Sequence, residues 1–163
     1  MDKKIVGLLL VLIVITIFII IFNKGIKYYE FSNNDFSIKY DSTWKIKNKN
    51  DFMLVHKKSK STLNIKCKLL DDNNIDTELS EIINNVIYSI GKQNSDYKLI
   101  SSDVLDNGYS YLYENDSNNV LVNVYKKDKK LIIVYYEANI DYYDIVLDSV
   151  DAILDSLEIK VGE

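Results

Sequence analysis

The chain of 163 residues contains no arginine and no proline, and it has a single histidine and a single cysteine. Without arginine, it lacks the planar side chain that proteins prefer for bidentate phosphate and carboxylate recognition. Its formal net charge of −4 argues against nucleic-acid binding, which needs a clustered basic surface. It has five glycines and no G-x-x-x-x-G-K-[ST] or G-x-G-x-x-G motif, so phosphate-cradling loops are also excluded.

What the sequence does contain in quantity is lysine, asparagine and isoleucine. Together with the missing arginine and proline, this composition is typical of an A+T-rich genome and indicates a bacterial source. Hydrophobic residues make up 47% of the chain, which is enough to build a folded core. The length fits one domain of ordinary size with an appendage.

The single cysteine and single histidine leave little room for catalysis. Cys67 excludes an intrachain disulfide and a cysteine-based zinc site, and its place in an alternating run favours a small buried side chain. His56, at the end of a predicted strand, is most simply a surface or structural residue. A hydrolase that uses His56 and Cys67 is the enzymatic alternative, because a hairpin would place both on adjacent strands. No third orienting group is evident, so we predict a protein without catalytic, metal or cofactor sites.

Residues 5–22 form an uninterrupted apolar run of about 27 Å as a helix, enough for a hydrocarbon core of about 30 Å. A cleaved signal peptide would need small residues at the end of the run, and a lipoprotein would need a cysteine there. Neither occurs, so we predict a retained transmembrane anchor. The predicted organisation is a tail at 1–4, the anchor at 5–22, a tether at 23–30 and a domain at 31–163.

The orientation of the anchor follows from its position at the N-terminus. A short N-terminal tail normally stays inside, which places the domain on the extracytoplasmic side of the cell membrane. Tyr28 and Tyr29 then lie where interfacial aromatic residues are expected. The lysine bias across the run is slight, and Gly7 stands alone without a GxxxG dimer motif.

Most of the domain shows the period-2 alternation of half-buried strands. Strands are expected at 36–40, 44–46, 52–57, 61–69, 97–105, 108–115, 119–127 and 131–138, with a short fragment at 158–161. The Asp106-Asn107-Gly108 run predicts a tight turn.

Two segments change to helical spacing. The first covers about residues 75–90 and ends at Gly91, and the second covers about 142–157 with Asp141 as N-cap and Asp144 completing a short capping box. The predicted fold class is therefore α+β, an antiparallel β-sheet flanked by two helices and preceded by one N-terminal transmembrane helix.

Two sequence stretches resemble the PsbP-like superfamily, which also contains the Ran-binding Mog proteins. Phe36-Ser-Ile-Lys-Tyr40-Asp-Ser-Thr-Trp44 is similar to that family's "f-s-i-x-y-P-x-x-W" opening, and Leu154-Asp-Ser-Leu-Glu-Ile159 resembles its "il-x-S-f-x-i" ending. Asp41 stands where the family usually has proline, although Asp also begins turns well. The resemblance covers about residues 29–161 and implies an α/β/α sandwich. It implies no shared catalytic residues, and fold does not determine function.

Two residue sets are candidates for an interaction surface. Five aspartates on the second predicted helix are spaced 3, 4, 3 and 4, which places them on one face: Asp141, Asp144, Asp148, Asp151 and Asp155. They could bind a cation or a basic partner, but they do not lie in a calcium-binding loop, and a solvated helix face explains them too. Tyr109, Tyr111 and Tyr113 share one face of a strand, either as an aromatic platform or as packing beneath a helix.

These observations predict a non-enzymatic, membrane-anchored extracytoplasmic module that binds or assembles with another envelope protein. The alternative is a minor component of a secretion or pilus-like envelope assembly. That alternative fits the anchor-plus-domain layout, but the usual prepilin leader glycine and early acidic residue are missing.

Overall fold

The structure is a computed structural model, and it describes residues 27–70, 81, 84, 85 and 96–160. The predicted anchor at 5–22 and most of the predicted helix at 75–90 lie outside the described residues. Within that predicted helix, Glu81, Asn84 and Asn85 are described, and they are helical and exposed. Among the residues that the structure describes, no helix has the length and apolar composition needed to cross a membrane.

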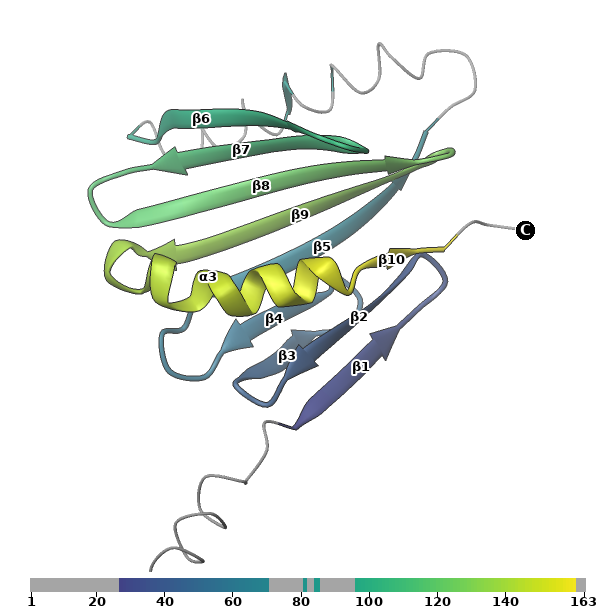
Figure 1. The fold of residues 1–163 in the computed structure, drawn as a ribbon, viewed down its shortest axis with the longest axis horizontal. Helices are drawn as coiled ribbons and strands as arrows, with labels where there is room; N and C mark the ends of the chain where they lie inside the picture. Colours follow the sequence, from purple (N-terminus) through teal and green to yellow (C-terminus); the bar gives the residue numbers. More distant parts are fainter. Residues whose placement is uncertain (1–26, 71–80, 82–83, 86–95, 161–163) are drawn as a thin grey trace, which may run out of the picture.

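The described domain contains two antiparallel sheets and one helix that is described in full (Figure 1). The small sheet has the order β1-β2-β10 and the large sheet has the order β3-β4-β5-β9-β8-β7-β6. The strands are β1 (Tyr28–Ser32), β2 (Phe36–Asp41), β3 (Trp44–Asn48), β4 (Met53–His56), β5 (Thr62–Leu69), β6 (Lys98–Leu105), β7 (Gly108–Glu114), β8 (Asn118–Lys127), β9 (Lys130–Asn139) and β10 (Glu158–Ile159), and the helix is α3 (Ile140–Asp155).

Two predictions about the domain need correction. Residues 28–30, predicted as part of a tether, belong to β1, which pairs with β2 over its whole length. The strands form two sheets instead of one, because β2 pairs with β1 and β10 and leaves β3 to begin the large sheet. Of the two predicted helices, the second is described in full as α3, and the first falls mainly outside the described residues.

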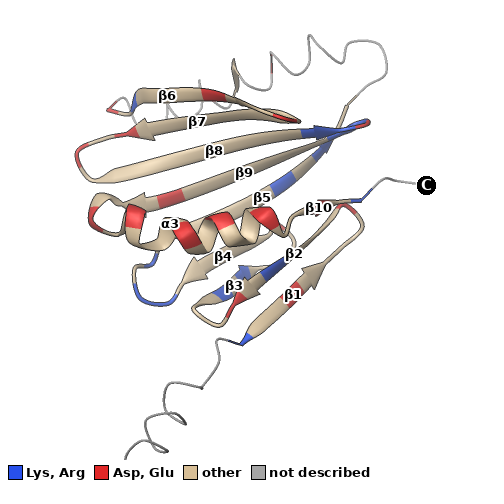
Figure 2. Cartoon of the chain, in the orientation of Figure 1, with Lys and Arg blue, Asp and Glu red and all other residues tan. Residues whose placement is uncertain are grey.

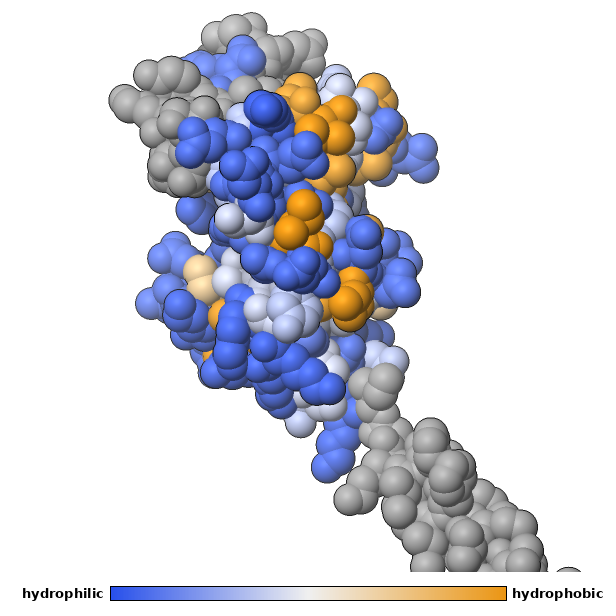
Figure 3. Space-filling view, turned by 90° about the vertical axis from the view of Figure 1, so that its left-hand side faces the viewer, coloured by the Kyte–Doolittle hydropathy of each residue, from blue (hydrophilic) through white to orange (hydrophobic). Residues whose placement is uncertain are grey.

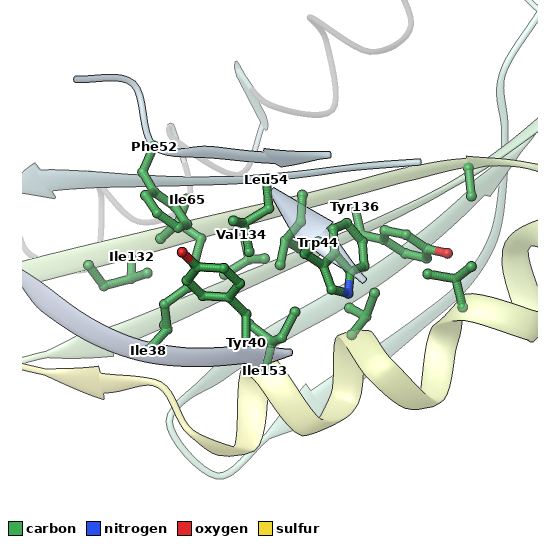
Figure 4. Packing of buried hydrophobic residues seen from close by; sticks show 14 of the residues in the cluster. Ile38, Tyr40, Trp44, Phe52, Leu54, Ile65, Ile132, Val134, Tyr136 and Ile153 are labelled. Atoms are coloured by element: carbon green, nitrogen blue, oxygen red, sulfur yellow. The ribbon is translucent and has the colours of Figure 1, made fainter. Parts of the chain in front are cut away.

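The main core lies between the large sheet on one side and α3 with the small sheet on the other (Figure 4). Trp44, at 1% exposure, and Tyr136, at 0%, are its largest fully buried side chains. Phe31 of β1 packs on Phe52 with a ring-centroid distance of 4.3 Å, which holds the first strand against this core. The alternation seen in the sequence thus places one face of β2, β4, β5 and β9 in a shared apolar layer.

A smaller core lies on the opposite face of the large sheet. It consists of buried residues at the end of β5 and on β7, β8 and β9: Leu70, Tyr113, Val120, Val122, Val124 and Leu131. The prediction that the central strands are apolar on both faces is therefore confirmed for β9, since its neighbouring residues Leu131 and Ile132 are both 0% exposed and belong to the cores on opposite faces.

The tight turn at Asp106-Asn107 is confirmed, since Leu105 pairs directly with Gly108. The glycine is needed for a different reason from the one the sequence indicates. A Cβ at Gly108 would lie 1.8 Å from the backbone oxygen of Val124 on β8, and its φ angle is not positive. Gly108 therefore allows close approach of two backbones, not an unusual turn conformation.

Candidate interaction surface

α3 begins at Ile140, two residues earlier than predicted, and Asn139 caps it instead of Asp141. The Asn139 side-chain oxygen accepts a hydrogen bond from the Asp141 backbone N–H at 3.0 Å. The predicted capping box of Asp141 and Asp144 is therefore wrong. Asn is among the preferred N-cap residues, and here it also ends β9, so strand and helix are joined without a loop.

The five aspartates of α3 are all exposed, as the spacing predicts. Figure 2 shows acidic residues recurring along the helix. Tyr143, Val146, Val150 and Ile153 form the buried side of the helix. The core therefore fixes the rotation of α3, so the carboxylates of Asp141, Asp144, Asp148, Asp151 and Asp155 face outward.

The carboxyl group of Asp151, on this acidic side, has a shifted pKa. Partial burial raises the pKa of its carboxyl group above the ordinary value of 3.8, and the nearby charges of Asp155 and Asp148 raise it further. No basic residue lies in the last turn of α3 to compensate for these charges. A cationic group placed here would relieve this repulsion.

Three apolar side chains are exposed on the first half of the same helix. Ile140 is 48% exposed, Tyr142 is 45% exposed and Ile145 is 74% exposed. Figure 3 shows apolar groups on one side of the molecule as separate patches within a mainly hydrophilic surface. We call the exposed side of α3, with its five aspartates and these three apolar residues, the α3 outer surface. It combines negative charge with apolar area, which a basic and partly apolar protein segment would complement.

The tyrosines of β7 do not form a uniform platform. Tyr109 and Tyr111 are half-buried and stacked, with ring centroids 6.5 Å apart. Tyr113 is 4% exposed and belongs to the smaller core, and its burial raises the pKa of the hydroxyl to about 12. The packing interpretation therefore holds for Tyr113, and the aromatic surface is reduced to the first two rings.

His56 lies in a local network at the β4–β5 turn. Its Nδ1 is 2.8 Å from Ser59 Oγ and accepts the Ser59 backbone N–H at 3.2 Å, and its ring packs edge-on against Trp44 at 5.2 Å. Burial lowers the pKa of the imidazole. Because the backbone N–H already donates to Nδ1, this histidine stabilises the turn, as the structural interpretation predicts.

The geometry contradicts the His56–Cys67 pair. They lie on adjacent strands, but β4 pairs with the first residues of β5, where Val55 is opposite Thr62. Cys67 lies five residues beyond Thr62, roughly 16 Å along the strand. Within the described residues, no group of three or more His, Cys, Asp or Glu side chains is arranged to hold a metal ion.

One polar network was missed by sequence reasoning. Trp44 Nε1 donates to Ser149 Oγ at 2.8 Å, and Ser149 Oγ donates to Asp41 Oδ2 at 3.1 Å. The other carboxylate oxygen of Asp41 accepts the Thr43 backbone N–H at 2.6 Å. Asp41 therefore caps the β2–β3 turn and connects it to α3. One residue in the sequence could have indicated this network: Asp41, which stands where the PsbP-like superfamily usually has proline.

An open groove of about 720 Å³ lies between the β8–β9 turn and the end of α3. Two of the lysines that line it already have structural partners: Lys127 Nζ donates to the Ile159 carbonyl oxygen at 3.1 Å, and Lys160 Nζ donates to Ser32 Oγ at 2.7 Å. The first bond attaches β8 of the large sheet to β10 of the small sheet, and the second attaches the residue after β10 to β1 within the small sheet. We therefore interpret the groove as a contact region between secondary-structure elements and not as a ligand site.

The fold can now be compared with known proteins. No protein-family model matches the chain, and no curated protein matches it in sequence. Among solved structures, it has the fold shared by PsbP and Mog proteins.

Three solved structures carry this result. The solution structure of cyanobacterial PsbP (CyanoP) from Synechocystis sp. PCC 6803 matches with a TM-score of 0.65 at 16% identity, over 85% of this chain and 96% of that chain. The Ran-binding protein Mog1p of Saccharomyces cerevisiae matches with a TM-score of 0.58 at 5% identity, over 83% and 95%. LpqN of Mycobacterium tuberculosis, described as involved in cell envelope biogenesis, matches with a TM-score of 0.52 at 11% identity, over 85% and 94%. At these identities the likeness establishes the fold, as the resemblance predicted.

Proposed function

We propose that this chain is a non-enzymatic, membrane-anchored module that binds or assembles with another envelope protein through the α3 outer surface. The observation that carries the proposal is the combination on one rigid helix of five exposed carboxylates with exposed Tyr142 and Ile145. The partner segment would be basic and partly apolar, since the surface offers both negative charge and apolar area.

The neighbours in fold support a binding role of this kind. Mog1p is described as a Ran-binding protein and LpqN as a protein of cell envelope biogenesis. Neither description names a catalytic activity, and the His56–Cys67 arrangement that would favour a hydrolase is not assembled here. A basic envelope protein fits both the negative charge of α3 and the proposed location of the domain.

The anchor would hold the domain close to the membrane. Because β1 begins at Tyr28, only residues 23–27 separate it from the predicted span at 5–22. Five extended residues reach at most about 18 Å. Tyr28, at 71% exposure, and Tyr29, at 48% exposure, then lie at the interface, where amphipathic aromatic rings are favoured.

Site-specific photo-crosslinking in the native membrane tests the binding surface. A photoreactive amino acid at Ile145, on the α3 outer surface, is compared with one at Asp116, which is exposed in the β7–β8 turn. We expect a defined envelope protein to crosslink from Ile145 and not from Asp116, and the crosslink to fall at least tenfold when Asp141, Asp144, Asp148 and Asp155 are changed to Asn.

The control for charge is a variant in which four exposed lysines away from α3, at positions 45, 47, 66 and 68, are changed to Gln. This variant should keep the crosslink. Equal crosslinking from Ile145 and Asp116, or a crosslink that survives neutralisation of the aspartates, would show that the α3 outer surface is not the contact.

Thiol labelling of intact cells tests the location. In a Cys67→Ser background, Asp116→Cys should react with a membrane-impermeant maleimide without lysis, because the domain is extracytoplasmic. Labelling that requires lysis would place the domain inside and exclude an envelope partner.

A further inference from the structure

The two edges of the large sheet differ in how well they are protected. β3 has five residues and carries exposed Lys45 and Lys47, the kind of charged, short strand that blocks pairing with another sheet. β6 has eight residues, seven of them exposed, and its exposed side chains include Leu99 at 51%, Ile100 at 48% and Val104 at 81%. In the described part of the chain, β6 pairs with β7 alone, so its outer row of backbone groups can accept another strand.

An irregularity at Ile100 places two opposite charges of β6 on the same face. Lys98 and Asp103 are five residues apart, which in a regular strand would put them on opposite faces. In β6, however, Lys98 pairs with Glu114 and Asp103 pairs with Ser110, and these partners lie four residues apart on β7. The register shift leaves Ile100 as the extra residue, so Lys98 and Asp103 face the same way.

We propose that β6 pairs antiparallel with β6 of a second copy of this chain, about a two-fold axis at Ser101. In this register, Lys98 of one copy lies opposite Asp103 of the other, and the symmetry repeats the pair. One step further out, Val104 lies opposite Tyr97, which packs against the smaller core and so shares the face of Val104. In both pairs, the two opposed side chains lie on the same face of the joined sheet, as strand pairing requires.

The charge order along β6 favours a second copy over an unrelated strand. Reversing the strand about Ser101 exchanges the positions of Lys98 and Asp103, so the edge is electrostatically complementary to itself. The two seven-stranded sheets would become one sheet of fourteen strands. The axis is perpendicular to the sheet, so both copies present α3 on the same face. The pairing goes beyond the proposed function, because it leaves the α3 outer surface free.

Cysteine crosslinking of the full-length chain in membranes tests the axis. In a Cys67→Ser background, Ser101→Cys should give a crosslinked dimer with a short bis-maleimide, because the two positions meet at the axis. Lys47→Cys on the other edge, β3, is the matched control and should give at least tenfold less dimer. Equal crosslinking at the two edges, or none at Ser101→Cys, would overturn the proposal.

A charge-exchange series tests the register, using sedimentation of the full-length chain in detergent micelles. Asp103→Lys and Lys98→Asp each replace two attractive cross-strand pairs by two repulsive ones, so each should raise the dimer Kd by roughly tenfold. The double variant restores opposite charges and should bring the Kd back to within about threefold of the original chain. Single effects without recovery in the double variant would refute this register, and a monomer at all concentrations would refute the dimer.

Discussion

The two faces of the large sheet are buried by different chemical means. On the face toward α3, the buried aromatic residues have polar atoms with partners: Trp44 Nε1 donates to Ser149 Oγ at 2.8 Å, and the Tyr136 hydroxyl donates to the Tyr143 carbonyl at 3.2 Å. On the opposite face, valines dominate, and the buried Tyr113 hydroxyl has no hydrogen-bond partner within the described residues. The first face thus specifies a single position for α3, while the second relies on apolar packing.

Replacing Trp44 by Ala should give the largest loss on the α3 face. The side chain is 1% exposed, and its removal leaves a cavity and takes away the hydrogen bond that Ser149 Oγ accepts from the indole N–H. We expect the free energy of unfolding to fall by about 4 kcal/mol in denaturant titrations. Ser149→Ala, which keeps the ring, should cost about 1 kcal/mol. Equal losses from the two variants would mean that the indole contributes through its N–H and not through its volume.

A matched pair of Tyr→Phe variants compares the two faces directly. Tyr136→Phe removes a paired hydroxyl and should lower the free energy of unfolding by about 1 kcal/mol. Tyr113→Phe removes a hydroxyl without a partner among the described residues and should leave stability unchanged or slightly raised. Thermal and chemical denaturation of both variants give the comparison, and a loss at Tyr113 as large as at Tyr136 would contradict the difference between the faces.

The smallest effect is expected at Asp151, on the outside of α3. Its carboxyl pKa is raised in the folded chain, so the folded state holds this proton more tightly than the unfolded state does. Stability from this group is therefore present at low pH and is lost as the pH rises from 3.8 through the folded pKa.

Asp151→Asn should accordingly stabilise the domain at pH 7 by a few tenths of a kcal/mol, and it should flatten the decline of stability above pH 4. The measurement is the free energy of unfolding across pH 3 to 8. Asp116→Asn, at an exposed turn position, is the control and should leave the profile unchanged.

Local patterns predicted most of the strands, since β2 through β9 each follow a run of alternating or apolar residues close to their observed bounds. The alternation of Phe36, Ile38 and Tyr40, for example, marks the buried face of β2 correctly. The tight turn before Gly108 was also predictable, because Asp and Asn residues favour such turns.

The features that the local sequence pattern could not predict depend on contacts between residues that are distant in the sequence. β1 reads as a tether because Phe31 alone of its residues packs into the core, and its strand conformation comes from pairing with β2. The role of Asp41 depends on Ser149, which is 108 positions away in the sequence. The separation of His56 from Cys67 depends on the register between β4 and β5, which the sequence of the hairpin alone left open.

The small sheet imposes an order on the completion of this fold. β2 accepts β1 on one side and β10 on the other, and Ile159 of β10 pairs with Phe36 of β2 from far along the chain. A chain that emerges from the ribosome N-terminus first can form the β1–β2 hairpin early, but it cannot close the other side of β2 until Ile159 has emerged. Until then a nascent chain would present β2 as an open edge, so the pairing of β10 is the step that closes the small sheet.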